Sequence, residues 1–151
     1  MKKLFSTATI GEMVLRNRIV MTAMHLGYTP EGLANDQLIA FYEERARGGV
    51  GLILIGGCTI DDRSAGAFHM IHLDEDRTIP GLALMAEAVH RHGARIGAQL
   101  FHAGRYAHSE MIGGRQPVSA SPIASKLTGE VPLEMGLGEI RDVISHFGEA
   151  A

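Results

Sequence analysis

The chain has 151 residues, 46% of them hydrophobic, and a formal net charge of −3, which fits one globular domain. This balance argues against nucleic acid or an anionic membrane as a partner, and no apolar run approaches the roughly 20 residues that cross a bilayer. The single cysteine, Cys58, excludes an intrachain disulfide and any metal centre built on several thiolates, so we expect a packed thiol. With no signal peptide recognised, the predicted location is the cytoplasm.

The first half of the chain predicts short strands followed by a helix. Residues 1–15 predict a small hairpin, with extended pieces around 4–5 and 13–15 and a turn at 10–12. Residues 18–22 are apolar and partly β-branched, which predicts the first buried strand. Asn35 or Asp36 is expected to cap the next helix. That helix should bury residues at helical spacing: Leu38, Phe41, Tyr42 and Ala46.

A second strand–helix–strand unit follows. The apolar run at 51–55 predicts a buried strand that ends at Gly56 and Gly57, with a polar loop after it. A helix is expected from about Pro80, a favoured first-turn residue, to His92. A third strand is expected at 95–100. The side chains of the helix that should face the core are those of Leu82, Leu84, Met85, Ala88 and Val89.

The last third of the chain predicts a long loop over residues 101–138 and then a helix from about Glu139, with apolar residues on one face: Ile140, Val143, Ile144 and Phe147. Alternating strands and helices predict an α/β protein with parallel strands. Parallel strands need cover on both faces, and a complete (β/α)8 TIM barrel takes about 250 residues. The sequence therefore predicts the N-terminal portion of such a barrel: the hairpin, then three βα units, the last incomplete.

Four stretches, in this order and spacing, resemble one family. They read LRNRIVM at 15–21, FYEERARGGVGLI at 41–53, HRHGARI at 90–96 and QLFHAGR at 99–105. These passages resemble the old yellow enzyme superfamily, the FMN-dependent NADH:flavin oxidoreductases, over essentially the whole chain. The MHLG stretch at 24–27 is most similar to the 2,4-dienoyl-CoA reductase branch.

This resemblance implies an FMN-dependent ene-reductase, in which NAD(P)H reduces the flavin and the flavin passes hydride to an activated alkene such as an enoyl or dienoyl compound. Residues 1–151 would form a partial FMN-binding domain that acts on a small molecule, and the full-length protein could be a homo-oligomer. Any iron–sulfur cluster would lie in a C-terminal part after residue 151. Because other flavin and substrate contacts of the family fall later, we expect the isolated chain to bind FMN weakly and to be inactive. Two alternatives are a trimethylamine-dehydrogenase-like amine oxidoreductase and a non-catalytic half-barrel.

The resemblance also implies cofactor-binding residues, which should lie at the C-terminal ends of the strands. Thr22, Ala23 and Met24 would lie along the flavin, Gly57 would be the small residue against the ring, and Gln99 would bind its pyrimidine edge. From the residues alone, an unsatisfied amide on a buried strand costs roughly 1–3 kcal/mol, so the Gln99 amide needs a partner. The alternatives are neighbouring strands or ordered water.

Histidines supply the remaining candidates. His25 is the candidate catalytic residue, able to touch flavin or substrate, although a structural or solvated histidine is the ordinary interpretation of a lone loop histidine. His102 and Arg105 are expected to position the active-site loop rather than to act in catalysis, and the alternative for Arg105 is to offset anionic charge of the cofactor or substrate. His69 and His72 have metal-like spacing but no evident third ligand, so we predict no metal site.

Overall fold

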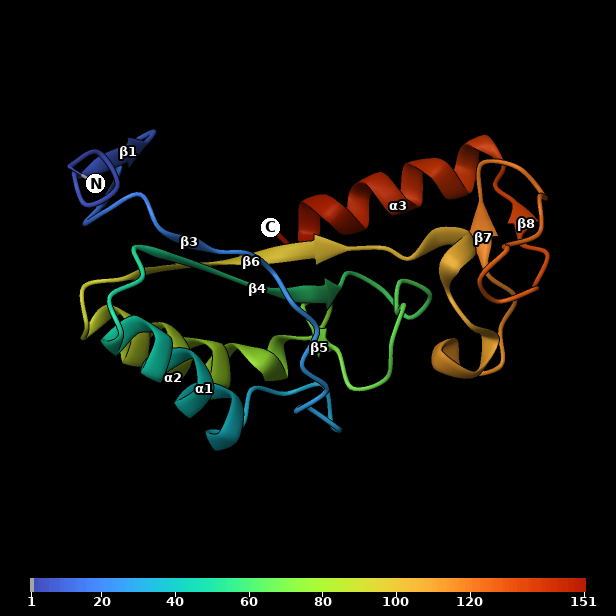
Figure 1. Cartoon of the computed structure of the whole chain (residues 1–151). Coiled ribbons are helices and arrows are strands. Elements are labelled where there is room, and N and C mark those ends of the chain that lie inside the picture. Colours follow the sequence, from blue (N-terminus) through green and yellow to red (C-terminus); the bar gives the residue numbers. More distant parts are fainter. Residues whose placement is uncertain (1) are drawn as a thin grey trace.

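The computed structural model describes residues 2–151 (Figure 1). The N-terminal hairpin is confirmed: β1 (Ala8–Ile10) pairs antiparallel with β2 (Met13–Leu15). The first extended piece was expected around residues 4–5, but those residues form a turn. The turn closes because the amide and the hydroxyl of Ser6 both donate to the Lys3 carbonyl.

A parallel sheet centred on β4 (Leu52–Thr59) holds the chain together. On one edge, β4 pairs first with β3 (Val20–Met21) and, further along, with β5 (Ile71–His72). On its other edge it pairs with β6 (Arg95–Phe101). The α/β class and the parallel strands are therefore confirmed.

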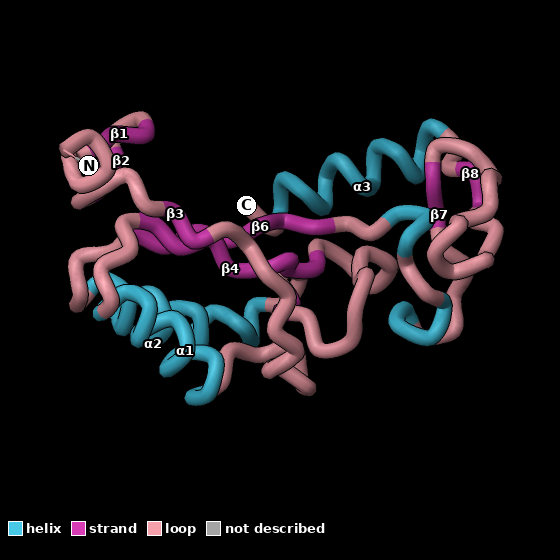
Figure 2. Tube along the Cα trace, viewed as in Figure 1, coloured by secondary structure: helices cyan, strands magenta, loops and turns pink. Residues whose placement is uncertain are grey.

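Two helices cover one face of this sheet, and they lie side by side in Figures 1 and 2. The first is α1 (Asp36–Arg47), whose predicted cap is confirmed because Asn35 Oδ1 accepts the Leu38 N–H at 3.0 Å. The second is α2 (Ile79–His90). Their buried side chains meet the sheet in one core that includes Leu38, Tyr42, Ala46, Met85 and Val89 together with Ile53, Ile55 and Cys58.

Several expectations about these elements are wrong in detail. The first strand has two residues instead of five, and Val20 is 42% exposed, because β3 is an edge strand and the chain leaves β4 after Met21. β5 lies within the predicted polar loop. Leu84 is 58% exposed because it lies about 100° around α2 from the inward-facing Met85.

The last third of the chain is a decorated connection followed by a helix. It contains two short 3₁₀ turns and a parallel pair formed by β7 (Val118–Ser119) and β8 (Leu133–Glu134). The helix α3 (Leu137–Glu149) begins two residues before the predicted Glu139, whose Oε2 accepts the Gly136 N–H at 2.9 Å. Nothing within the described residues covers the apolar face of α3 fully, since α3 has no buried residue.

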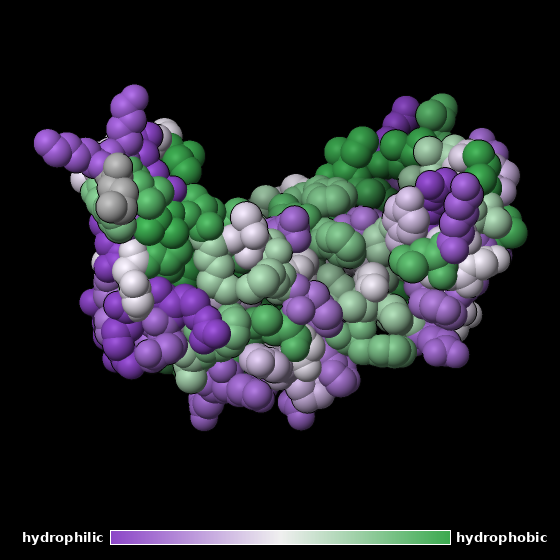
Figure 3. All heavy atoms as spheres, viewed as in Figure 1, coloured by the Kyte–Doolittle hydropathy of each residue, from purple (hydrophilic) through white to green (hydrophobic). Residues whose placement is uncertain are grey.

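The surface reflects this open arrangement. In Figure 3 the edge of the molecule is hollowed between the N-terminal hairpin and α3, and hydrophobic residues border the hollow. Exposed apolar side chains on the bordering elements include Ile10, Val14, Val20, Ile140 and Ile144. Within residues 2–151, no helix has the length and apolar character that a membrane crossing requires.

Candidate functional site

The C-terminal ends of three parallel strands come together in the sheet. The pairing of Met21 with Ile53 leads the segment from Thr22 to His25 along the following residues of β4. On the opposite edge, Ile55 pairs with Ala98, so that Gln99 comes next on β6. Active sites of parallel barrels are built at such strand ends. The structure therefore brings the predicted residues into one region, on both sides of β4.

A β-bulge lies at the centre of this region. Between the Ile55–Ala98 and Cys58–Leu100 pairs, β4 has two residues, Gly56 and Gly57, where β6 has only Gln99. Bulges of this kind bend a strand and redirect neighbouring side chains. The prediction that the two glycines end the strand is wrong, because β4 continues through them to Thr59.

The two glycines fit closely against β6. A Cβ atom on Gly56 would lie 2.9 Å from Cβ of Gln99, and one on Gly57 would lie 2.7 Å from Cγ of Phe101. Such approaches are closer than real Cβ atoms make. The space beside Gly57, predicted to admit a flavin ring, is therefore occupied on this side by the Phe101 ring, and Gly56 is the glycine that faces Gln99.

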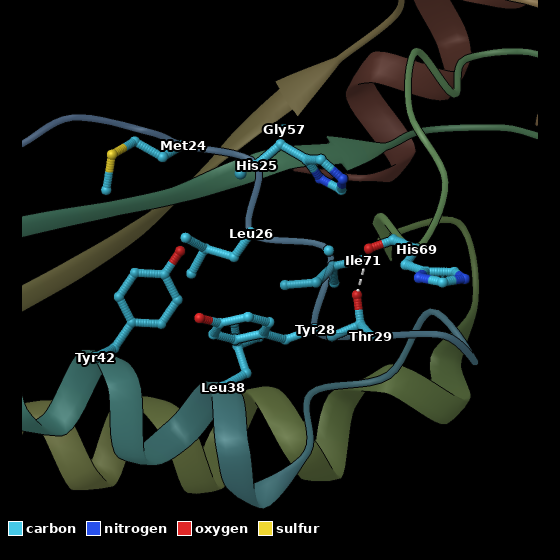
Figure 4. A pocket seen from close by; sticks show the side chains of 12 residues that line it. Met24, His25, Leu26, Tyr28, Thr29, Leu38, Tyr42, Gly57, His69 and Ile71 are labelled. Carbon is cyan, nitrogen blue, oxygen red and sulfur yellow. Dashed lines mark hydrogen bonds between the residues drawn. The ribbon is translucent and has the colours of Figure 1, made fainter.

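Tyr42 of α1 supports the bulge from the helix side. Its side chain is almost fully buried and rises from α1 toward β4 (Figure 4). Burial raises the pKa of Tyr42 to about 12 and the nearby Cys58 thiol adds to the shift, while a backbone hydrogen bond at Gly56 opposes it. Burial likewise raises the pKa of Cys58 to about 12, so this thiol stays protonated and unreactive, as expected of a packed thiol.

Met24, His25 and Gly57 line a small cavity between the segment that follows β3 and helix α1 (Figure 4). The Thr29 hydroxyl closes one side of it by donating to the His69 carbonyl at 2.7 Å. The cavity volume is about 20 Å³, enough for about one water molecule and far too small for a three-ring cofactor. A planar ligand would therefore have to lie on the open face of the sheet.

That open face carries Gln99. Ile55 and Cys58 pack into the core that the helices cover, so their pairing partners on β6 lie on the helix-covered face of the sheet. Side chains alternate between the two faces along a strand, so Gln99, which lies between these partners, is on the opposite, open face. The expectation that Gln99 lies on a buried strand is wrong, because β6 has no buried residue and Gln99 is exposed; within residues 2–151 no side-chain hydrogen bond of its carboxamide is found. Thr22, Met24 and His25 are exposed as well, and Ala23 is half-buried. The backbone of this segment and the exposed Gln99 amide together offer hydrogen-bond donors and acceptors, which a flavin ring needs in addition to flat contact.

His102 lies at the end of β6 in a different environment. Its side chain is only 10% exposed, and Nδ1 accepts the Gly104 N–H at 2.9 Å, which leaves a proton on Nε2 in the neutral ring. Burial lowers the pKa of His102, although the nearby Asp61 carboxylate opposes the shift. The bond to Gly104 supports the prediction that His102 orders this loop, and Arg105 donates to the hydroxyl of the neighbouring Tyr106.

Asp61 links this loop to α3, because its Oδ2 accepts from Nδ1 of His146 at 3.0 Å. Burial alone would raise the pKa of Asp61, but hydrogen bonds from the His146 ring and the Arg63 N–H keep it below the ordinary value. The same contact raises the pKa of His146. This polar link lies beside the candidate site, and sequence periodicity gave no sign of it.

The two histidines with metal-like spacing do not share a cluster. His72 has two carboxylates close by, since its Nδ1 lies 3.7 Å from Asp74 Oδ1 and 3.4 Å from Glu75 Oε1. His72 therefore has neighbouring carboxylates that the spacing of the two histidines did not indicate. Arg77 already forms an ion pair with Glu75, and exposed acidic groups of this kind are common without a metal ion.

Comparison with known proteins assigns the family. The NADH:flavin oxidoreductase / NADH oxidase family pattern matches residues 3–151. The chain belongs to this family. A metal reductase of Desulforamulus reducens is 57% identical over 151 residues, covering 100% of this chain and 22% of the relative. An NADH:acrylate oxidoreductase of Vibrio harveyi is 36% identical over 138 residues, covering 90% of this chain and 14% of the relative.

The solved structures agree on the fold. Morphinone reductase in complex with tetrahydroNAD superposes with a TM-score of 0.90 at 24% identity, covering 97% of this chain and 44% of that one. The chain thus spans less than half the length of these proteins, and its strands correspond to the first part of a TIM barrel of the old yellow enzyme type.

The sequence did not indicate the contacts that Gly56, Phe101 and Tyr42 make at the bulge. A Gly-Gly pair inside an apolar run is itself a known bulge signal, and it was the available clue to Gly56. Tyr42 was predicted as a core residue only. Its link to the bulge depends on the strand register, which hydrophobic periodicity does not report.

Proposed function

We propose that this chain forms the first strands of an FMN-dependent, NADH- or NADPH-using oxidoreductase of ene-reductase type, acting on an activated alkene. The observation that carries the proposal is the bulge at Gly56 and Gly57. It lies between the exposed carboxamide of Gln99 and the segment from Thr22 to Met24, in which Thr22 and Met24 are exposed. Family membership supports the cofactor, and the acrylate-reducing relative supports an alkene acceptor.

In this proposal each residue has a defined task. The Gln99 carboxamide presents one acceptor oxygen and two N–H donors, which suits a ring edge that carries both N–H and carbonyl groups. The backbone of Thr22, Ala23 and Met24 offers further donors and acceptors, and the Met24 side chain offers an apolar contact. His25 is exposed beside them and would contact flavin or substrate. FMN, when bound, supplies hydride transfer from the nicotinamide to the acceptor.

The finer assignment is to enoyl or dienoyl thioesters, as in the 2,4-dienoyl-CoA reductase branch. Support comes from the MHLG stretch at 24–27, which resembles that branch and contains His25. An iron–sulfur cluster would in that case be bound outside residues 1–151. The metal reductase relative raises a second acceptor class, because its name indicates electron transfer to a metal.

A binding experiment tests the site. FMN is titrated into the ¹⁵N-labelled chain, with the expectation that resonances of residues 22–25, 56–57 and the Gln99 side chain shift together. Gln99→Ala should weaken binding roughly two- to tenfold, the value of one ordinary hydrogen bond. Gln116→Ala is the matched control, since the exposed Gln116 amide donates to the Val131 carbonyl far along the chain. Equal affinities for the two variants would count against the proposal.

An activity experiment separates the alternatives. The native gene product, purified from its source cells, is examined for bound flavin and is assayed with NADH against an enone, a dienoyl thioester, a soluble ferric chelate and trimethylamine. Alkene reduction is expected. Trimethylamine oxidation would assign an amine oxidoreductase, and a colourless, inactive product would assign a non-catalytic half-barrel.

A further inference from the structure

We propose that Gly56 is a positioning residue that holds the side chain of Gln99 in place on the open face of the sheet. The identity of the group that Gln99 binds rests on the proposed function. The positioning itself depends only on this chain. Gly56 lies in the bulge, directly opposite Gln99, where two residues of β4 face one residue of β6.

Contact distances make the fit specific to glycine. A Cβ on Gly56 would approach three atoms of Gln99: Cβ at 2.9 Å, the backbone oxygen at 3.4 Å and Oε1 at 3.5 Å. All three nearest neighbours of that position belong to one residue. A methyl group at position 56 must therefore displace Gln99, either by turning its side chain or by moving β6 away from β4.

The backbone conformation gives an independent reason. Gly56 has φ +146°, in the range that L side chains rarely adopt. Any other residue would pull the bulge toward a different geometry. Because the bulge fixes which β4 atoms face Gln99, that change would also reach the carboxamide.

Neighbouring contacts leave little freedom for the bulge to adjust. On the helix side the almost fully buried Tyr42 lies close to it, since Tyr42 and Gly56 line the same small cavity. Along the strand, Gly57 fits against Phe101, whose ring also approaches Gly66. Gln99 and Phe101 are two residues apart on β6 and share a face. Each fits against one glycine, so the pair of glycines fixes the position of this part of β6 relative to β4.

Two other glycines of the chain serve as matched controls. Gly97 is also on β6, but a Cβ there would meet only Cδ2 of Leu54, a flexible side-chain end, at 3.3 Å. Gly49 has φ +106°, yet a Cβ there would have nothing within 4 Å. Gly97→Ala therefore adds a methyl group to β6 outside the bulge. Gly49→Ala adds one at a positive φ where no other atom lies nearby.

The first readout requires no cofactor. The chain has three glutamines, Gln37, Gln99 and Gln116, so the side-chain NH₂ resonances of Gln99 can be assigned by their loss in Gln99→Ala. Gly56→Ala should shift or broaden these resonances, whereas Gly97→Ala and Gly49→Ala should leave them in place. Unchanged Gln99 resonances in a folded Gly56→Ala chain would overturn the proposal.

The second readout is FMN titration. Gly56→Ala should weaken binding by about the same factor as Gln99→Ala, roughly two- to tenfold, and the double variant should be no weaker than either. If Gly56→Ala shifts Gln99 but the wild-type chain shows no FMN response at the strand ends, the proposed function fails and the positioning role stands. If Gln99→Ala weakens binding and Gly56→Ala does not, the positioning role fails and the proposed function stands.

A compensating variant covers the case in which Gly56→Ala does not fold. Gln99→Gly removes the Cβ that lies 2.9 Å from the added methyl. Gly56→Ala/Gln99→Gly should then regain a cooperative urea transition, while Gly56→Ala/Gly97→Ala should not. Absence of this selective rescue would contradict the contact on which the proposal depends.

Discussion

Removing the Arg16 side chain should weaken this fold substantially without touching the candidate site. Its guanidinium donates to three backbone carbonyls at the ends of separate elements. Nη2 donates to Ala46 in the last turn of α1 at 2.5 Å, Nη1 to His92 after α2 at 2.5 Å, and both Nε and Nη2 to Val50 before β4 at 3.1 and 2.8 Å. Helix C-terminal carbonyls carry partial negative charge and lack partners within the helix, so a cation there is favourable.

The magnitude follows from the bonds lost. A hydrogen bond to a charged group contributes roughly 1.5–3 kcal/mol when buried, and Arg16 is half-buried, which brings each contact nearer to 1 kcal/mol. For three carbonyls, Arg16→Met should lower the free energy of unfolding by about 3 kcal/mol. Since domains of this size are typically stable by about 5–15 kcal/mol, such a loss is a large fraction.

Urea unfolding followed by circular dichroism measures this effect. With a denaturant slope of about 2 kcal/mol/M, the midpoint of Arg16→Met should fall by about 1.5 M. Arg16→Lys keeps the positive charge but lacks the planar guanidinium group, so its urea midpoint should lie between those of the wild type and Arg16→Met. Arg18→Met is the control, because Arg18 donates to Ser6 and Thr7 at exposed positions. Equal midpoints for Arg16→Met and Arg18→Met would refute the reasoning.

Three further predictions concern individual side chains. Asn35→Ala removes both the α1 cap and the bond to the Tyr28 carbonyl, and urea unfolding should show a loss of about 1–2 kcal/mol. Cys58 should react with a thiol reagent at pH 8 only after unfolding, since burial raises its pKa to about 12; fast native labelling would contradict this. The hydrogen bond to Asp61 raises the pKa of His146, so their pairing should stabilise α3 below pH 6.5 and be lost as pH rises through the raised value. NMR titration should find that Asp61→Asn returns this pKa toward the ordinary value.

The sequence predicted best what depends on local chemistry. The Asn35 cap and α1 follow from one polar side chain before a run of helical period, and both are confirmed. It predicted worst what depends on distant partners. β5 forms in a polar loop because Cys58 and Thr59 offer it an open edge of β4. The apolar period of α3 indicates a face suited to burial but not the surface that would cover it, and within residues 2–151 Ile144 remains 66% exposed.

The bulge explains why the predicted end of β4 at Gly56 and Gly57 is wrong. Strict alternation from Ile53 and Ile55 would turn residue 57 toward the helices and Cys58 away from them. The extra residue in β4 reverses this, so that Cys58 enters the helix-covered core and the strand continues to Thr59. Two glycines lower strand propensity, which is why the sequence predicted an end there. The absence of side chains at these positions is what lets β4 approach Gln99 and Phe101, so the same residues that weaken the local signal bring the candidate site together.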